Sequence, residues 1–449
     1  MTTDEIFRIQ SMIHFLNQQK FIQKKKDYSR LFVSVLDVLC SQYISQYGDF
    51  VPLEQSKQRE VWINSTYGSF VKAMKKLRRR KDYRPLLAQE LVVLGRFFNS
   101  NVNLHEPRLL ALLGWKEKDI SKIMVRLVKS PEYAAFVRFL EQEDQYFSLP
   151  KFNIAVCATM SAGKSTFINA LLGHDYLPSR NEATTATITT VQDKDHSKSF
   201  FGCVETEMGI EPFSQEVTLE QMNCWNESPS VQRIYLQGDL DNVGNHNAIV
   251  CVHDTPGTNN SSDENHHDIT MNFLKNNPMD ALIFVANGEH LCTNDEKRLL
   301  EDLQKYFSTT KRIPVIFALN KMDSFDTEKE SLENIVRQYK TFVKELGFND
   351  ELVFPVSAKA ARLFKMALKG NAGKFTAKER VSFDSYFHML TQNSQEVNER
   401  FSIEIGKNSY PISAVKSALN QSGIFALEER MEILVQAKGG GLSPSAFNQ

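Results

Sequence analysis

Residues 153–172 read NIAVCATMSAGKSTFINALL, and this stretch decides the fold. The apolar run NIAVCAT predicts a buried β-strand, and STFINALL predicts the helix that follows it. Between them lies a turn of small residues that ends in Gly163-Lys164-Ser165. A strand, such a turn and a helix in this order form a phosphate-binding loop, in which backbone N–H groups and the helix N-terminus surround the phosphates. The stretch therefore predicts a nucleotide-binding α/β domain.

The residues of this loop are predicted to contact the nucleotide. They are consecutive in the chain: Ala158, Thr159, Met160, Ser161, Ala162, Gly163, Lys164, Ser165 and Thr166. We expect Lys164 to bridge the β- and γ-phosphates and Ser165 to bind Mg²⁺. Ala158 replaces the motif's usual first glycine and adds one methyl group. Met160 stands where many such enzymes place a polar catalytic group, so the loop predicts nucleotide binding and leaves the rate of hydrolysis open.

The rest of the chain after residue 149 alternates between strands and helices. The predicted strands are NIAVCAT, ATITTV, NAIVCVHD, DALIFVANG, IPVIFALN and LVFPVSA. This alternation predicts a mainly parallel, doubly wound sheet, the α/β fold class of P-loop domains. We expect the domain to cover residues 149–437, with a strand-containing insert at 194–245 and a helical insert at 366–412. The polar tail 438–449 is expected to be flexible.

Three further motifs follow predicted strands and complete the nucleotide site. Asp254-Thr255-Pro256-Gly257 follows AIVCVH, where Asp254 can reach Mg²⁺ through water and the Gly257 N–H can meet the γ-phosphate. Asn320-Lys321-Met322-Asp323 ends VIFAL, and Ser357-Ala358-Lys359 ends LVFPV. The carboxyl ends of the strands are where open α/β sheets bind ligands. Four motifs in this order predict one site for GTP or GDP with Mg²⁺.

The last two motifs predict selectivity for guanine. The Asp323 carboxylate can accept from both N1–H and the exocyclic amine of guanine, an arrangement that adenine does not offer. Rejection of ATP would follow because that carboxylate would stay unpaired. The Ala358 N–H is placed to donate to guanine O6. Asn320, Lys321, Ser357 and Lys359 complete the predicted base-binding set.

Residues 174–187 are the predicted first switch segment. Thr185 is the residue expected to coordinate Mg²⁺ when a γ-phosphate is present, with Thr184 as the alternative. Both threonines also suit the start of the strand ATITTV. His266 and His267 follow the second switch and lack the neighbouring cysteine or third histidine of a zinc site; His266 is a candidate for orienting water.

Residues 1–148 are predicted to form a helical bundle or stalk. Thr2 and Glu5 fit a capping box, after which Ile6 begins an apolar stripe with helical spacing. Further helices are predicted at about 30–46, 56–78, 86–99 and 117–129, and Ser130-Pro131-Glu132 begins another.

Charge is distributed unevenly along the chain, whose formal net charge is −1. Residues 1–150 carry 24 Lys and Arg against 16 Asp and Glu, and the remainder carries 29 against 38. Seven of the basic residues lie within 72–81. They suit a solvated helix face, an anionic membrane surface or nucleic-acid phosphates. Aromatic residues are not interleaved with them, which disfavours stacking of single-stranded nucleic acid.

Several classes of protein are excluded by composition. The apolar runs are far shorter than the roughly 18 residues of a membrane span. The N-terminus MTTDEIFRIQ has no secretory-signal pattern. The six cysteines are scattered without a CxxC pair, which is typical of free thiols in a reducing compartment. We therefore expect a cytoplasmic location, including the inner face of the membrane.

Taken together, the motifs resemble those of bacterial dynamin-like GTPases. The segments that carry the resemblance are SAGKSTFINALLG, LPS…ATTATIT, DTPG, DALIFVANGEH, NKMD, PVSAK and SGIFALEERM. The resemblance implies hydrolysis of GTP to GDP and phosphate, stimulated when two G domains pair across their nucleotide faces. It implies a catalytic group of Lys164, Ser161 and Thr185, in which Ser161 arranges charge-compensating contacts. It also implies remodelling or tethering of membranes through helical stalks.

Two departures from that family leave alternatives open. Met160 takes the position of the glutamine that positions the attacking water in eukaryotic dynamins, and a thioether cannot do this. Members of that family normally continue into stalk helices after the last G-domain helix, whereas this sequence runs on for only about a dozen residues after the helix expected there. A second hypothesis is therefore a GTP-gated binding module with little hydrolysis, whose partner protein supplies the stalk or the membrane contact. A third is an RNA- or ribosome-associated GTPase.

Overall fold

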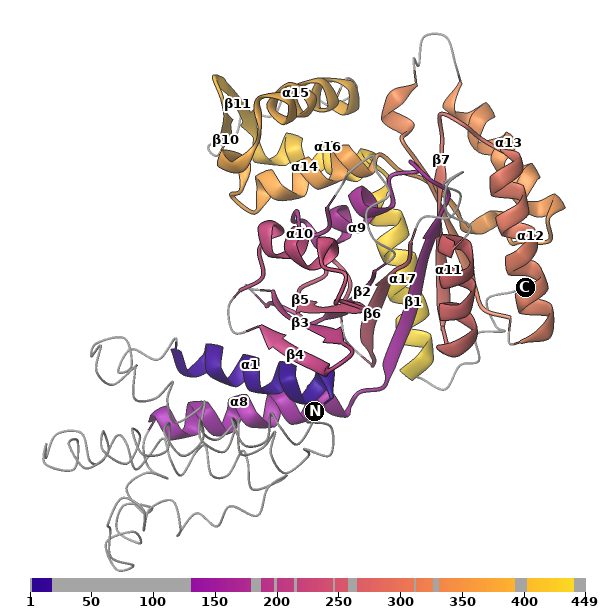
Figure 1. The fold of residues 1–449 in the computed structure, drawn as a ribbon. Coiled ribbons are helices and arrows are strands. Elements are labelled where there is room, and N and C mark those ends of the chain that lie inside the picture. Colours follow the sequence, from indigo (N-terminus) through magenta and orange to yellow (C-terminus); the bar gives the residue numbers. More distant parts are fainter. Residues whose placement is uncertain are drawn as a thin grey trace, which may run out of the picture. The chain divides into compact units, whose positions relative to one another are not determined.

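The computed structural model describes residues 2–17, 131–178, 187–197, 200–213, 216–244, 247–256, 265–310, 312–325, 331–391 and 402–439 (Figure 1). Its contacts divide the chain into two compact units. One contains residues 1–148 with 208–210, and the other contains residues 149–207 with 211–449.

Two helices of the first unit are described, α1 (Thr3–Asn17) and α8 (Pro131–Ser148). Proline at the first position of α8 costs no hydrogen bond because the N–H there would be unpaired in any residue. Phe15 and Phe139 stack with their ring centroids 4.4 Å apart, which packs the two helices together. The helices predicted between them lie outside the described residues, so the bundle as a whole stays a prediction.

The second unit is built on a nine-stranded sheet in the order β4-β3-β5-β2-β6-β1-β7-β8-β9 (Figure 1). In chain order the strands are β1 (Lys151–Ala158), β2 (Ile188–Asp193), β3 (Phe201–Thr206), β4 (Gly209–Phe213), β5 (Arg233–Gly238), β6 (Ile249–Asp254), β7 (Ala281–Asn287), β8 (Val315–Asn320) and β9 (Val353–Pro355). Parallel pairs join β6, β1, β7, β8 and β9 in turn, and β2 with β5. The pairs β2–β6 and β3–β5 are antiparallel. The sheet is therefore mixed and mostly parallel, as is typical of P-loop GTPases.

Helices cover both faces of this sheet. They are α9 (Lys164–Leu172), α10 (Leu219–Glu227), α11 (Asn265–Asn276), α12 (Asn294–Thr309), α13 (Leu332–Glu345), α14 (Ala358–Leu368), α15 (Ala377–Thr391), α16 (Ile412–Gln421) and α17 (Ile424–Gly439). Short 3₁₀ turns are η1 (Met322–Ser324), η2 (Asp350–Leu352) and η3 (Ala372–Lys374).

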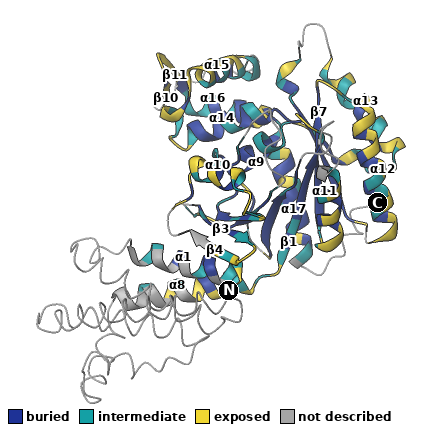
Figure 2. Cartoon of the chain, viewed as in Figure 1, coloured by how far each residue is buried: buried dark blue, intermediate teal, exposed yellow. Residues whose placement is uncertain are grey.

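Alternate residues of β1 belong to two different hydrophobic clusters. Ile154 and Val156 pack in the cluster that includes α9, α14 and α17, whereas Ala155 and Cys157 pack in the one that includes α11, α12 and α13. Successive strand residues point to opposite faces of a sheet, so this strand is buried on both sides (Figure 2). Burial on both sides fixes the position of the loop that follows β1.

The two inserts differ in how well they were predicted. The strand-like runs within 194–245 are β3 and β5, and the insert also contains β4 and α10. The all-helical prediction for 366–412 is wrong, because the hairpin of β10 (Ser402–Ile405) and β11 (Asn408–Pro411) follows α15. Its turn contains Gly406 at φ 65°, a conformation that glycine adopts without a steric penalty.

The last helix is longer than predicted. α17 ends at Gly439, and Lys438 donates hydrogen bonds to Asp280 Oδ2 at 2.6 Å and to the Lys151 carbonyl at 2.5 Å. These contacts hold the first residues of the predicted flexible tail in the helix. Residues 440–449 lie outside the described part of the chain.

Candidate nucleotide-binding site

The loop between β1 and α9 has the backbone conformation of a phosphate-binding turn. Ser161 and Gly163 have φ angles of 60° and 87°. A Cβ at Gly163 would lie 2.6 Å from Asn320 Nδ2, so both conformation and space require glycine there. Ala158 is fully buried, so the extra methyl group that departs from the motif fits in the core. Met160 is 47% exposed.

Lys164 and Asp254 meet at the end of two neighbouring strands. Val156 of β1 pairs in register with Asp254 of β6. Lys164, at the start of α9, forms an ion pair with Asp254 Oδ1, and their side chains are 11% and 15% exposed. Thr255, the next residue, donates from Oγ1 to the Val156 carbonyl at 2.8 Å. This arrangement places the lysine predicted for phosphate and the carboxylate predicted for Mg²⁺ in direct contact.

Asn320 joins the phosphate-binding loop to the predicted base-binding loop. Its side chain is 3% exposed. Nδ2 donates to the Ala162 carbonyl at 2.9 Å, and Oδ1 accepts from the Ala358 N–H at 3.1 Å. The amide predicted to meet guanine O6 therefore donates to Asn320 in this structure, and a base would have to share or replace that bond.

Asp323 lies in η1 and has an unsatisfied oxygen. Its Oδ1 is buried and has no hydrogen-bond partner among the described residues. A buried acceptor without a donor costs about 1–3 kcal/mol. A guanine base, which presents two donors on one edge, fits such a group.

Lys321, two residues earlier, donates to Glu289 Oε2 at 2.6 Å. This hydrogen bond lowers the pKa of Glu289. Lys321 has a φ of 64°, so the second residue of the base-binding motif has a left-handed conformation.

The loop that contains Ser357 is held by the turn between α16 and α17. The Ser357 N–H donates to the Ser422 carbonyl at 2.9 Å. A Cβ at Gly423 would lie 2.0 Å from the Pro355 carbonyl oxygen, so only glycine permits this approach. The Ser-Gly that opens SGIFALEERM is the sequence signal for this support.

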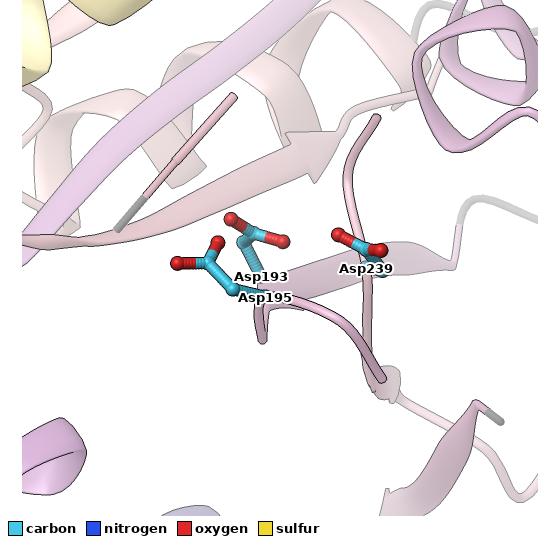
Figure 3. Close-up of side chains that lie close together, drawn as sticks. All are labelled: Asp193, Asp195 and Asp239. Atoms are coloured by element: carbon cyan, nitrogen blue, oxygen red, sulfur yellow. The ribbon is translucent and has the colours of Figure 1, made fainter. Parts of the chain in front are cut away.

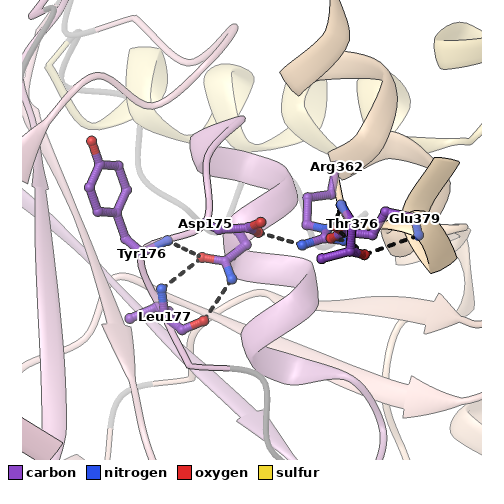
Figure 4. A network of polar contacts seen from close by, with 7 residues as sticks. Asp175, Tyr176, Leu177, Arg362, Thr376 and Glu379 are labelled. Carbon is purple, nitrogen blue, oxygen red and sulfur yellow. Dashed lines mark hydrogen bonds and ion pairs between the residues drawn. The ribbon is translucent and has the colours of Figure 1, made fainter. Parts of the chain in front are cut away.

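Sequence reasoning missed a polar network that holds the start of the first switch segment (Figure 4). Asn169 of α9 is buried, and its side chain bonds the backbone of Tyr176 and Leu177 at 2.8–3.1 Å. Arg362 of α14 pairs with Asp175 at 2.5 Å and with Glu379 of α15 at 2.7 Å. The one available signal was an asparagine within the apolar helix STFINALL.

Several predicted residues cannot be placed. Thr184, Thr185, Gly257 and the His266 side chain lie outside the described residues. His267 lies 3.5 Å from Asp302 of α12. Within the described part of the chain, the Ser165 hydroxyl at the start of α9 and the Asp254 carboxylate are the predicted groups that could hold Mg²⁺.

A cluster of acidic residues lies at the ends of β2 and β5. One oxygen each of Asp193, Asp195 and Asp239 lies within 4.8 Å of the others (Figure 3). Asp193 Oδ1 accepts from the Leu240 N–H at 2.7 Å. Burial, followed by the neighbouring carboxylates, raises the pKa of Asp193 well above its usual value. These groups belong to none of the predicted nucleotide motifs.

The mixed sheet and the loops at its edge define a P-loop domain of the GTPase class. Residues 154–322 match the dynamin family, and the chain carries a dynamin-family G domain. The resemblance inferred from the motifs is thus confirmed.

Two curated relatives and one solved structure illustrate the similarity. The chain is 26% identical over 192 residues to the "Bacterial dynamin-like protein" of Nostoc punctiforme, covering 40% of the chain and 26% of that protein. It is 25% identical over 345 residues to the "Probable transmembrane GTPase FZO-like, chloroplastic" of Arabidopsis thaliana, covering 72% of the chain and 33% of that protein. A structure described as an oligomerised bacterial dynamin pair for sensing and tethering of membranes aligns at 18% identity with a TM-score of 0.37, covering 77% of the chain and 52% of that one.

The chain spans about half, or less, of the length of the curated relatives that it matches. Among the helices described, none is long and apolar enough to cross a membrane.

Proposed function

We propose that this protein is a Mg²⁺-dependent dynamin-like GTPase that hydrolyses GTP to GDP and phosphate. The observation that carries the proposal is the Asn320 side chain, which bonds the phosphate-binding loop and the base-binding loop at once. This link supports one site, in which the phosphate and base ends of a nucleotide would lie at the same edge of the sheet. The unpaired Asp323 oxygen supports guanine as the base.

The proposed site residues would act mainly by placing charged and polar groups around the phosphates of the nucleotide. Lys164 would leave Asp254 and bind the β- and γ-phosphates, where it offsets the charge that develops during phosphoryl transfer. Ser165 and the released Asp254 would hold Mg²⁺, with Thr185 as a further ligand. The metal supplies charge neutralisation between the phosphates. Ser161 would add charge-compensating contacts within the loop.

We further propose that activity rises when two G domains pair across their nucleotide faces, and that the protein acts at a membrane surface with a partner protein. Support comes from the dynamin-family G domain and from relatives whose names describe a dynamin-like protein and a transmembrane GTPase.

The second candidate is a GTP-gated binding module with little hydrolysis. The observation that favours it is Met160, whose exposed thioether can neither donate a strong hydrogen bond nor orient water. In such a module the nucleotide would control binding of a partner protein.

Turnover measured against protein concentration separates the two candidates. We expect the GTPase rate per molecule, in potassium buffer with Mg²⁺, to climb with concentration as G domains meet. The Lys164→Ala variant is the blank and should show no turnover. GTP binding with a wild-type rate equal to the blank would establish the gated module, and normal turnover in the variant would refute the proposed mechanism.

A further inference from the structure

The turn between α16 and α17 lies directly against the backbone that follows β9. The Ser422 carbonyl accepts a hydrogen bond from the Ser357 N–H at 2.9 Å. A Cβ added to Gly423 would collide with the Pro355 carbonyl oxygen and would lie 3.5 Å from Val356 Cα. The turn and the segment 355–357 are therefore in backbone contact, and the lack of a side chain on Gly423 permits it.

The turn itself is anchored on both sides. Ser422 caps α16, where its N–H donates to the Ala418 and Leu419 carbonyls at 3.1 Å. The Ser422 hydroxyl also donates to the Leu419 carbonyl, at 2.5 Å. Ile424, the first residue of α17, is fully buried in the hydrophobic cluster that includes α9, α14 and α17. A side chain at position 423 would thus have to separate two anchored backbone segments.

The segment that faces the turn leads into the predicted guanine contacts. Ser357 directly precedes Ala358, whose N–H is predicted to donate to guanine O6. In this structure that N–H donates to Asn320 Oδ1 at 3.1 Å, so it is directed at the other base-binding motif. The Val356 carbonyl accepts from the Met322 N–H of that motif at 3.3 Å. A shift of residues 355–357 would therefore move the donor intended for guanine O6.

We propose that Gly423 is a positioning residue for guanine recognition, because its close approach sets the place of the Ala358 N–H that would donate to guanine O6. This inference rests on the proposed GTPase function. A hydrogen bond weakens steeply as its angle departs from linear, so a small shift of the donor is enough to weaken it. Gly423 would act through Ala358 without touching the nucleotide.

The inference predicts a loss that is specific to one atom of the base. GDP and 6-thio-GDP share N1–H and the exocyclic amine, and they differ only in the oxygen or sulfur at position 6. Sulfur is a weaker hydrogen-bond acceptor than a carbonyl oxygen. The ratio of GDP affinity to 6-thio-GDP affinity at pH 7 therefore reports the contact with O6. A general loss of stability would weaken both nucleotides and leave this ratio as it was.

The experiment compares two glycine variants of the full chain. Gly423→Ala adds the colliding Cβ at a φ of 80°. Gly370→Ala is the matched control, because Gly370 has a φ of 78°, a Cβ there would meet nothing within 4 Å, and it belongs to no nucleotide motif. Both variants carry the strain of a left-handed alanine, and only the first carries the collision. We expect Gly423→Ala to lower the GDP-to-6-thio-GDP ratio roughly two- to tenfold, the effect of one hydrogen bond, and Gly370→Ala to keep the wild-type ratio.

Thermal unfolding without nucleotide verifies that both variants fold. If Gly423→Ala does not fold, hydrogen exchange of the wild-type protein provides the test. Coupling between two sites is reciprocal, so a nucleotide that keeps the O6 contact must stabilise the turn that positions its donor. At equal saturation, GDP should slow amide exchange in residues 418–424 more than 6-thio-GDP does. Equal exchange with the two nucleotides would overturn the inference.

The outcomes distinguish this inference from the function on which it rests. A folded Gly423→Ala variant with the wild-type ratio would overturn the role of Gly423, even though wild-type protein prefers GDP. Equal falls in the ratio for both glycine variants would also overturn it, because left-handed strain would then be the cause. Wild-type protein that binds neither nucleotide would instead refute the proposed function.

Discussion

Gly163 shows how one residue can decide a site. It has a left-handed conformation, directly precedes α9, and lies so close to Asn320 that any side chain would collide with the amide. Ala158, by contrast, departs from the usual motif at a position where the core has room for a methyl group. The two positions show why the motif tolerates alanine at its start and requires glycine before its lysine.

A single substitution at Asp323 tests how the site recognises the base. In Asp323→Asn, the amide presents a donor to the base, which suits the carbonyl of xanthine and opposes the amine of guanine. We expect the affinity for GTP to fall by at least about a hundredfold, since a buried polar group is left unpaired. Affinity for XTP should rise, as measured by nucleotide competition.

The control for this substitution is the melting temperature without nucleotide, which should change little because asparagine has the same shape as aspartate. Preference for guanosine nucleotides at the wild-type level would show that Asp323 does not read the base.

At the scale of elements, α14 and α17 are joined through a buried ion pair. Lys365 and Glu428 form this pair and are 2% and 1% exposed. Asn242 adds a hydrogen bond from Nδ2 to Glu428 Oε2 at 3.1 Å. Burial raises the pKa of Glu428 to about 7, although Lys365 acts in the opposite direction. A carboxyl whose pKa is raised on folding contributes stability below its unfolded pKa, and that contribution is lost as the pH rises through the folded pKa.

Lys365→Met should therefore be costly at pH 8 and mild at pH 5. At pH 8 it leaves a buried carboxylate without a cation, which costs about 3–5 kcal/mol of unfolding free energy. At pH 5 Glu428 is protonated in both proteins, so the difference should shrink. Denaturant unfolding at the two pH values measures this.

The double variant Lys365→Met/Glu428→Gln removes both charges and should recover most of the stability lost at pH 8. Equal losses for the single variant at pH 5 and pH 8 would show that the lost packing of Lys365, rather than the charge of Glu428, sets the cost.

Local sequence patterns predict the strands and helices of the G domain. They do not predict the contacts between residues that lie far apart in the chain. The strand before the phosphate-binding loop and the helix after it follow from apolar runs and periodicity, so β1 and α9 were predictable. The ion pair between Asp175 and Arg362 joins residues 187 positions apart, and no local pattern contains that information. The hairpin β10–β11 was missed because its strands are only four residues long.

At the scale of the whole molecule, the charge asymmetry is the feature that the G domain does not explain. Residues 1–150 carry a net charge of +8 and the remainder −9. If residues 72–81 are attracted to anionic lipid, each basic residue contributes about 1 kcal/mol near the surface, and the attraction is screened over about 8 Å at physiological salt. Binding to vesicles should then increase with the anionic lipid fraction and decrease with salt.

Replacing Arg78, Arg79 and Arg80 with glutamine tests the dense part of this cluster. We expect vesicle affinity to fall at least about tenfold, given about 1 kcal/mol for each charge removed. The matched control removes the same charge at Lys24, Lys25 and Lys26, where fewer basic neighbours surround the change, and should lose less. Co-sedimentation with phosphatidylserine-containing vesicles measures both.

Unchanged vesicle binding of the arginine variant would indicate that these residues form a solvated helix face. Salt-sensitive binding to RNA in place of vesicles would favour an RNA-associated GTPase.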